Sequence, residues 1–187
     1  MLVSHEDLIV RRPGATLWLT GLPAAGKTTL AIAVERRLSD LGRAAMVLDG
    51  DLLRKGLSQD LDLSPEGRSE QTRRAAHVSV LLARAGLVAI VSLISPYAED
   101  RRRAREIHEA QGVAFHEIWI DTPLEVCQER DPKGLYKRAR AGELRCMTGV
   151  DAPYEPPLEP ELCVRGGEES AQAAAERVAA LLEGVLA

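Results

Sequence analysis

The sequence has few cysteines, few aromatic residues and no long apolar run, and each shortage excludes a class of protein. Cys127, Cys146 and Cys163 are too few and too scattered for a disulfide framework, and no C-x-x-C pair indicates zinc or redox chemistry. Aromatic residues make up 3% of the chain, so the core must be mainly aliphatic. No apolar run approaches the roughly 18 residues that a membrane span needs, and residues 1–14 lack the apolar stretch of a signal peptide. The sequence therefore predicts a cytoplasmic protein with no membrane anchor.

The length and charge narrow the possibilities further. The 187 residues fit one domain, so we expect a single unit over residues 1–187. Lysine and arginine number 24 against 28 acidic residues, a formal charge of −4, which argues against a general nucleic-acid binder. Only four of the basic residues are lysines, and the others are arginines, which suit bidentate binding of phosphate or carboxylate.

Apolar runs that alternate with helical patterns predict an α/β fold with a parallel five-stranded sheet flanked by helices. The predicted strands are Ala15–Thr20, Ala44–Leu48, Leu87–Leu93, Phe115–Ile120 and Glu161–Val164. The predicted helices are Lys27–Leu41, Glu66–Ala85, Glu99–Gln111, one opened by Pro123, and Glu168–Leu186. The nearly continuous apolar run Leu87–Leu93 is typical of a central strand. Residues 131–160 are rich in glycine, proline and charge, and their length indicates a lid over the ligand-binding edge of the sheet.

One motif carries the chemistry, because Gly21–Thr28 matches the phosphate-binding loop G-x-x-x-x-G-K-[ST] between a predicted strand and a predicted helix. Its glycines aim backbone N–H groups inward, Lys27 reaches the β- and γ-phosphates, and Thr28 offers a hydroxyl to Mg²⁺. A mere glycine-rich turn is the alternative, and the flanking strand and helix argue against it. The predicted ATP-binding residues are Gly21, Leu22, Pro23, Ala24, Ala25, Gly26, Lys27, Thr28 and Thr29.

Several polar residues follow the other predicted strands. Asp49 and Asp51 follow the second strand and can hold a metal or orient a hydroxyl, although Asp51 is also a plausible cap for the next helix. Arg54 and Arg68 can clamp a second anionic substrate or lie solvated on a helix. The hydroxyl of Ser95 can bind a ligand or accept a phosphoryl group, although Ser-Pro is equally a turn signal.

Other polar and aromatic residues predict structure rather than chemistry. We expect Asp121 or Thr122 to cap the helix that follows, and Trp18 and Trp119 to pack in the core. The four histidines show no metal-ligand spacing with cysteines or carboxylates.

With these motifs in place, the chain resembles the adenylylsulfate kinase family over about Ala15 to Leu162. The resemblance rests on the phosphate loop, DGD-x-x-R at 49–54, GLSQDL at 56–61, ISPY at 94–97, DTPLEVCQERDPKGLYKRARAGEL at 121–144 and TGVDAPYEPP at 148–157. It implies ATP-dependent phosphorylation of the 3′-hydroxyl of adenosine 5′-phosphosulfate (APS) in sulfate assimilation, with Mg²⁺ as cofactor. It also implies a homodimer.

The resemblance further implies roles for individual residues. Lys27, Asp51 and Ser95 would be catalytic, Ser95 as a phosphoserine intermediate, and Thr28 and Asp51 would hold the metal. The implied substrate-binding residues are Asp51, Arg54, Leu63, Arg68, Gln71, Ile94, Ser95, Lys133 and Met147.

The chain departs from the family pattern around the acceptor. Leu52 and Gln71 stand where the family usually has asparagine, and Leu63 and Met147 correspond to two phenylalanines that stack on the adenine of APS. Aliphatic side chains retain the buried area of such a stack but not its geometry, so we expect weaker APS binding. One alternative is a kinase of this fold that acts on another small anionic nucleotide, such as cytidine diphosphoramidate. A second alternative is a nucleotide-binding module without transferase activity.

Overall fold

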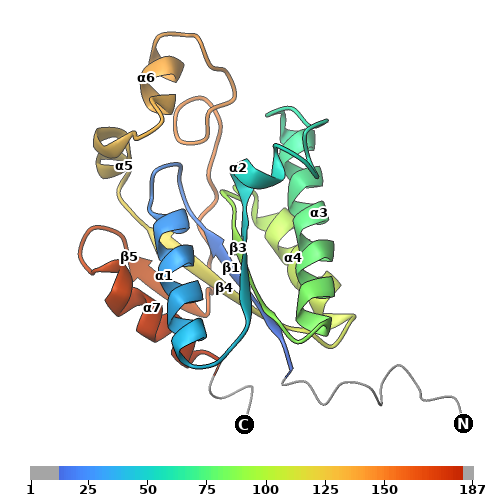
Figure 1. The fold of residues 1–187 in the computed structure, drawn as a ribbon. Coiled ribbons are helices and arrows are strands. Elements are labelled where there is room, and N and C mark those ends of the chain that lie inside the picture. The colour runs from blue at the N-terminus through green and yellow to red at the C-terminus, as the bar shows by residue number, and fades with distance from the viewer. Residues whose placement is uncertain (1–12, 183–187) are drawn as a thin grey trace, which may run out of the picture.

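The fold is built on a sheet of five parallel strands in the order β2-β3-β1-β4-β5. The computed structural model describes residues 13–182. The strands are β1 (Ala15–Thr20), β2 (Ala45–Asp49), β3 (Val88–Ser92), β4 (Ala114–Asp121) and β5 (Leu162–Arg165). Every strand therefore ends at the same edge of the sheet, which Figure 1 shows beneath the segment that carries α5 and α6.

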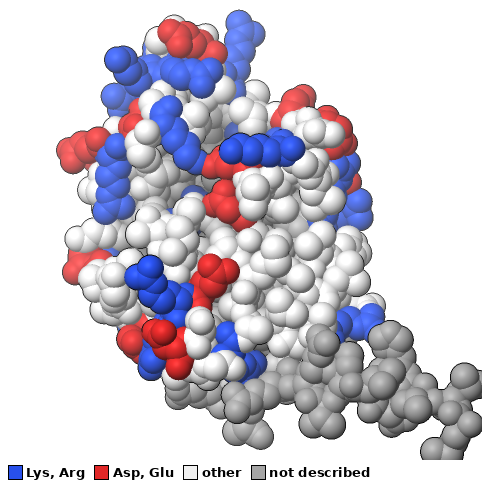
Figure 2. Space-filling view, viewed as in Figure 1, with Lys and Arg blue, Asp and Glu red and all other residues white. Residues whose placement is uncertain are grey.

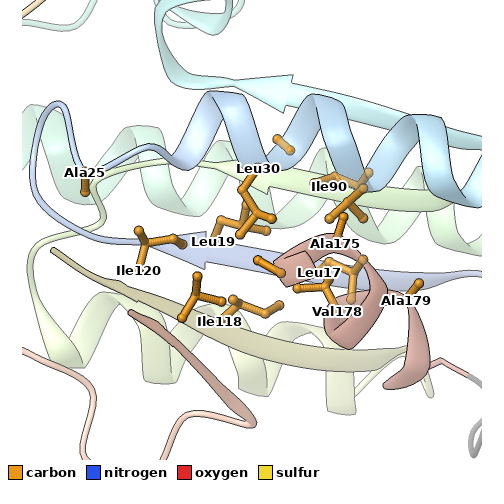
Figure 3. Packing of buried hydrophobic residues seen from close by; sticks show 14 of the residues in the cluster. Leu17, Leu19, Ala25, Leu30, Ile90, Ile118, Ile120, Ala175, Val178 and Ala179 are labelled. Atoms are coloured by element: carbon orange, nitrogen blue, oxygen red, sulfur yellow. The ribbon is translucent and has the colours of Figure 1, made fainter. Parts of the chain in front are cut away.

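Helices cover both faces of the sheet (Figure 1). They are α1 (Lys27–Asp40), α2 (Gly50–Leu53), α3 (Pro65–Arg84), α4 (Ala98–Glu109), α5 (Leu124–Arg130), α6 (Leu135–Arg140) and α7 (Ala171–Ala180). The alternation of side chains along each strand divides the core into two main layers. Leu17, Leu19 and Ile118 pack against α1 and α7 (Figure 3), whereas Trp18 and Phe115 pack with residues of α3 and α4 on the other face.

The sequence predicted the order and type of the main elements correctly. The run Leu87–Leu93 forms an internal strand, β3, whose five residues are all buried, and it lies between β2 and β1. The predicted lid also contains α6, which its glycine, proline and charged residues did not indicate.

Some details of the prediction were wrong. The last helix begins at Ala171 rather than Glu168, because Ser170 caps it by accepting a hydrogen bond from the amide of Ala173. Pro123 precedes α5 as its cap residue, and neither Asp121 nor Thr122 caps that helix. Trp119 is only half-buried, whereas Trp18 is fully buried.

Two expectations concern the ends of the chain. The N-terminal segment without a signal peptide falls largely outside the described residues 13–182. The final helix ends at Ala180, earlier than the predicted end at Leu186, and residues 183–186 of that prediction lie outside the described range. Within that range, no helix is both long and apolar enough to cross a membrane.

Candidate active site

A cavity of about 1100 Å³ lies at the carboxyl edge of the sheet, between the phosphate loop, α3 and the lid. It collects nearly every residue that the sequence singled out for nucleotide or substrate binding. Only Gly21 and Leu22 are not part of its lining. The cavity therefore unites segments that lie far apart in the chain, as expected for the ligand-binding edge of a parallel sheet.

The phosphate loop takes the backbone conformation that its motif requires. Gly26 has a φ of 109°, a value that favours glycine, and it immediately precedes α1. Ala24 also has a positive φ, 60°, which is strained for a residue with a β-carbon. The loop is closed by a hydrogen bond from the Ala25 amide to the Leu22 carbonyl at 3.1 Å. This arrangement places the positive N-terminal end of α1 at the floor of the cavity.

Lys27 is the buried cation of the loop. Its ammonium group donates to the carbonyl oxygens of Gly21 at 2.9 Å and Leu22 at 2.7 Å. Burial lowers the pKa of Lys27 to about 8, so the charged form still predominates at neutral pH. A cation held in this way is available to anionic groups that enter the cavity.

Asp49 is hydrogen-bonded to the phosphate loop. The residues themselves offered both Asp49 and Asp51 as metal ligands, whereas the family resemblance implied Asp51 alone. Its carboxylate accepts a hydrogen bond from the Thr28 hydroxyl at 2.8 Å and another from the Asp51 amide at 3.0 Å. Asp49, not Asp51, is therefore the cap of α2. A threonine hydroxyl beside a carboxylate is an oxygen donor set that fits Mg²⁺, which keeps most of its ligands as water or substrate oxygens. The D-G-D motif contained this signal, but only the strand geometry distinguishes its two acids.

Asp51 faces the lid instead. Its carboxylate forms an ion pair with Lys133, and both side chains are more than half exposed. The lid makes two further contacts with the walls of the cavity. The Tyr136 hydroxyl donates to the Pro23 carbonyl at 3.0 Å, and Arg68 donates to the Cys146 carbonyl at 2.5 Å. The structure thus brings the lid down onto the phosphate loop, Asp51 and α3.

Two arginines lie close together on the α3 side of the cavity. Arg54 donates to the carbonyls of Leu61 and Asp62, and Arg68 donates to the carbonyl of Leu63. Burial lowers the pKa of both side chains, and the charge of Arg68 lowers that of Arg54 further. Neither guanidinium forms a salt bridge with a carboxylate in residues 13–182. Two neighbouring cations without a direct counter-ion favour the binding of an anion.

The remaining predicted substrate residues also line this side of the cavity. Gln71 donates to the Gly50 carbonyl at 3.0 Å and so supports the D-G-D turn. Leu63 is 36% exposed, whereas Met147 is 4% exposed, and both present apolar surface to the cavity. Leu52, by contrast, is 61% exposed and is not part of the lining.

Ser95 lies at the back of the same cavity. Its hydroxyl accepts a hydrogen bond from the Trp18 indole at 3.1 Å, and the residue is only 3% exposed. No carboxylate or imidazole within residues 13–182 forms a hydrogen bond with the Ser95 hydroxyl. The geometry suits a ligand contact better than attack on a phosphoryl group, since an unactivated hydroxyl is a weak nucleophile.

The sequence did not predict one part of the cavity lining. It extends past the phosphate loop to Arg130, Gly166, Gly167 and Ser170. Thr122 joins this region because its hydroxyl donates to the Ala25 carbonyl at 2.8 Å, and Pro123 takes the cap position of α5 in its place. Arg130 donates to the same carbonyl at 3.3 Å. Thr122 and Arg130 belong to the segment 121–144 that carries the family resemblance, but no role was derived for them there, and only the fold reveals that they meet Gly166, Gly167 and Ser170.

Comparison with known proteins gives consistent matches. The family model described as adenylylsulphate kinase matches residues 13–165. An adenylyl-sulfate kinase of Clostridium acetobutylicum is 46% identical over 160 residues, which cover 86% of this chain and 78% of the relative. The solved structure of the Mycobacterium tuberculosis APS kinase CysC in complex with AMPPNP and APS matches with a TM-score of 0.89 and 47% identity, covering 91% of this chain and 98% of that one. A hexameric APS kinase of Thiobacillus denitrificans matches with a TM-score of 0.70 and 30% identity, covering 94% of this chain and 30% of that one.

Proposed function

The chain belongs to the adenylylsulphate kinase family, and from this premise we propose how its residues transfer the γ-phosphoryl group of ATP to the 3′-hydroxyl of APS. The observation that carries the proposal is one cavity that joins a phosphate loop to a pair of arginines for which residues 13–182 supply no salt-bridge partner. Each half of the cavity suits one anionic nucleotide. The products are ADP and 3′-phosphoadenosine 5′-phosphosulfate.

On the ATP side, the residues from Gly21 to Thr29 hold the phosphates. Backbone N–H groups of the loop and the N-terminus of α1 contact the phosphate oxygens, and Lys27 moves its ammonium group from the loop carbonyls to the β- and γ-phosphates. Thr28, Asp49 and Asp51 are the residues that would hold Mg²⁺. When bound, the ion neutralises the charge that develops on the phosphates.

On the APS side, Arg54 and Arg68 bind the phosphosulfate group. Leu63 and Met147 provide apolar surface for the adenine ring, and Gln71, Ile94 and Ser95 complete the pocket. The identities of the relatives, 46% and 47%, favour APS over cytidine diphosphoramidate despite the aliphatic replacements.

The chemical step needs positioning more than covalent help. The 3′-oxygen of APS attacks the γ-phosphorus as the bond to the bridging oxygen of ADP breaks, and the hydroxyl proton passes to the Asp51 carboxylate. Lys133 pairs with that carboxylate in the structure and offers its charge to the transferring group once substrates separate them. The lid excludes water from the transfer. Ser95 then acts as a contact for APS, and no phosphoserine is required.

We also propose a cytoplasmic enzyme that assembles as a homodimer. The reducing compartment is supported by the three scattered cysteines, none of which forms a disulfide within residues 13–182. The dimer is supported by the family resemblance.

A coupled assay tests the proposed function. ADP release is measured with ATP and Mg²⁺ in the presence of APS, AMP, cytidine diphosphoramidate or no acceptor. We expect efficient release only with APS, with the 3′-phosphorylated product confirmed by mass. Turnover of another nucleotide in place of APS would overturn the proposed acceptor. Nucleotide binding with no turnover of any acceptor would overturn the proposed kinase activity.

The variant Lys27→Ala tests the assignment of the phosphate loop. Loss of a preorganised positive charge at the transferring phosphates predicts a fall in kcat of about 100- to 1000-fold. The exposed Lys55, which does not line the cavity, provides the control Lys55→Ala with expected wild-type activity. Thermal unfolding of both variants checks that the fold is intact. Full activity of Lys27→Ala would contradict the assignment.

A further inference from the structure

Arg101 connects three segments of the chain without lining the cavity. It lies on α4 and is 3% exposed. Its guanidinium donates to the Glu117 carboxylate at 2.6 Å, to the Ser95 carbonyl at 2.7 Å and to the Glu155 carbonyl at 2.7 Å. The next residues of the helix, Arg102 and Arg103, are more than half exposed and pair with acids on α4 itself. A buried arginine that uses three edges of its planar fork has a fixed geometry that a lysine cannot reproduce.

The first of these segments is the strained backbone at Ser95. Ser95 has a φ of 38°, which is unusual for a residue with a side chain. Such strain persists only where the surroundings hold it, and it is concentrated at functional sites. Besides Arg101, Trp18 binds the Ser95 hydroxyl, and the Thr20 hydroxyl donates to the Ile94 carbonyl at 2.7 Å. These contacts fix the two residues, Ile94 and Ser95, that face the acceptor side of the cavity.

The second segment is the downstream end of the lid at Tyr154 and Glu155. The Glu155 amide donates to the Pro96 carbonyl at 2.9 Å, and the Glu155 carboxylate accepts from the Ala98 amide at 2.7 Å. The Tyr154 hydroxyl shares a hydrogen bond of 3.1 Å with the Thr20 hydroxyl, and the Arg101 guanidinium lies 5.9 Å from the centre of the Tyr154 ring. The end of the lid and the Ser95 turn therefore share one anchor.

We propose that Arg101 is a positioning residue for the acceptor nucleotide. By binding the carbonyls of Ser95 and Glu155 together, it sets the separation between two walls of the APS pocket. One wall is formed by Ile94 and Ser95, and the other is the lid segment that carries Met147 seven residues before Tyr154. Glu117, held in β4, neutralises the buried guanidinium and fixes its orientation. The inference rests on the proposed function for the identity of the acceptor. The hydrogen bonds from Arg101 to the carbonyls of Ser95 and Glu155 do not depend on that function.

The test replaces Arg101 by lysine, which keeps a positive charge beside Glu117 but cannot make all three contacts. The control is Arg102→Lys, on the exposed side of the same helix. In the assay with APS and ATP, Arg101→Lys should raise the KM for APS about tenfold, because the separation between the two walls of the APS pocket is no longer fixed. The KM for ATP should stay within about twofold of the wild-type value. Arg102→Lys should change neither constant. A general loss of folded enzyme would lower the apparent kcat and leave both KM values unchanged.

A second measurement tests, without any substrate, whether Arg101 holds the end of the lid in place. Amide hydrogen exchange at Glu155 and Ala98 should become faster in Arg101→Lys than in wild type or in Arg102→Lys, while exchange in β1 stays unchanged. Wild-type exchange at both amides, or equal changes in the two KM values, would overturn the positioning role. If wild-type enzyme releases no ADP with APS, the proposed acceptor fails, and the exchange measurement still decides whether Arg101 anchors the lid.

Discussion

At the scale of single residues, the surface that we propose for the acceptor base is aliphatic. Leu63 comes from the segment before α3 and Met147 from the lid, and both line the cavity. The resemblance assigns aromatic stacking to these two positions. Leucine and methionine can exclude water from an adenine ring, but they cannot supply the preferred offset geometry between two π-systems.

Restoring the aromatic rings should therefore tighten APS binding. For Leu63→Phe combined with Met147→Phe we expect a KM for APS that is about 2- to 10-fold lower, the equivalent of about 0.5–1.5 kcal/mol of stacking. Leu63 is 36% exposed and leaves room for a larger ring, whereas Met147 is 4% exposed, so the single variant Leu63→Phe separates stacking from overpacking. Leu57→Phe is the control, because Leu57 is 45% exposed and does not line the cavity. An unchanged or higher constant in both Leu63 variants would count against adenine stacking at these positions.

At the scale of the elements, the sequence was most informative where a pattern depends on near neighbours. The apolar runs predicted all five strands, and the phosphate-loop motif predicted the turn between β1 and α1. The order β2-β3-β1-β4-β5 and the identity of the acid beside Thr28 depend on contacts between distant segments. Thr122 illustrates the limit, because threonine is a favoured cap residue, but here Pro123 is the cap and the Thr122 hydroxyl donates to the Ala25 carbonyl. Local propensity could not reveal that competing partner.

The lid offers a matched pair of lysines for testing its role. Lys133 precedes α6 and pairs with Asp51, whereas Lys137 lies within α6 and does not line the cavity. We expect Lys133→Ala to lower kcat/KM for APS about 100-fold, because the proposed function gives its charge to the transferring group. Its melting temperature should change little, since exposed ion pairs contribute about 0–1 kcal/mol.

The control Lys137→Ala removes the same charge four residues away and should keep wild-type kinetics. Two results would contradict the role of Lys133. One is a similar loss of activity in both variants, which would indicate a general electrostatic effect. The other is wild-type activity of Lys133→Ala.

At the scale of the whole molecule, charge is distributed unevenly. The formal charge of the chain is −4, and the charges of the lid are segregated along the chain. Residues 130–145 carry six arginines or lysines and two acids, whereas residues 146–160 carry three acids and no arginine or lysine. Figure 2 shows basic side chains gathered around the lid, at the top of the molecule, with fewer acidic groups among and below them. The basic residues 130–145 include Arg130, Lys133 and Arg138, which line the cavity, and their charge favours the entry of two polyanionic nucleotides into a protein that is acidic overall.

The stability of the whole fold should depend on pH through two histidines at the sheet. His108 is fully buried, and its ring lies 3.0 Å from the hydroxyls of both Ser79 and Thr16, while Nδ1 donates to the Ala104 carbonyl at 2.6 Å. Burial lowers the pKa of His108, and burial also lowers that of His116 on β4. In the folded state both rings therefore stay neutral at a pH where the unfolded chain, with a histidine pKa of about 6.5, takes up protons.

The sign of the effect follows from this difference. Stability from the two neutral rings is complete above about pH 6.5 and is lost as the pH falls towards the folded pKa values, because the unfolded state then binds more protons. Each ring can contribute up to about 1.4 kcal/mol per pH unit to the fall in the free energy of unfolding.

Denaturant titrations of wild type and His108→Gln between pH 7.5 and 5 measure the contribution of His108. Glutamine keeps a hydrogen-bonding side chain but has no titratable group. The variant should be less stable at pH 7.5 and should lose stability less steeply on acidification. Because carboxylates titrate in both proteins, the difference between the two slopes gives the contribution of His108 alone. Identical slopes would mean that His108 takes up its proton in the folded state as readily as in the unfolded chain, and that its burial between β1, α3 and α4 does not oppose the charge.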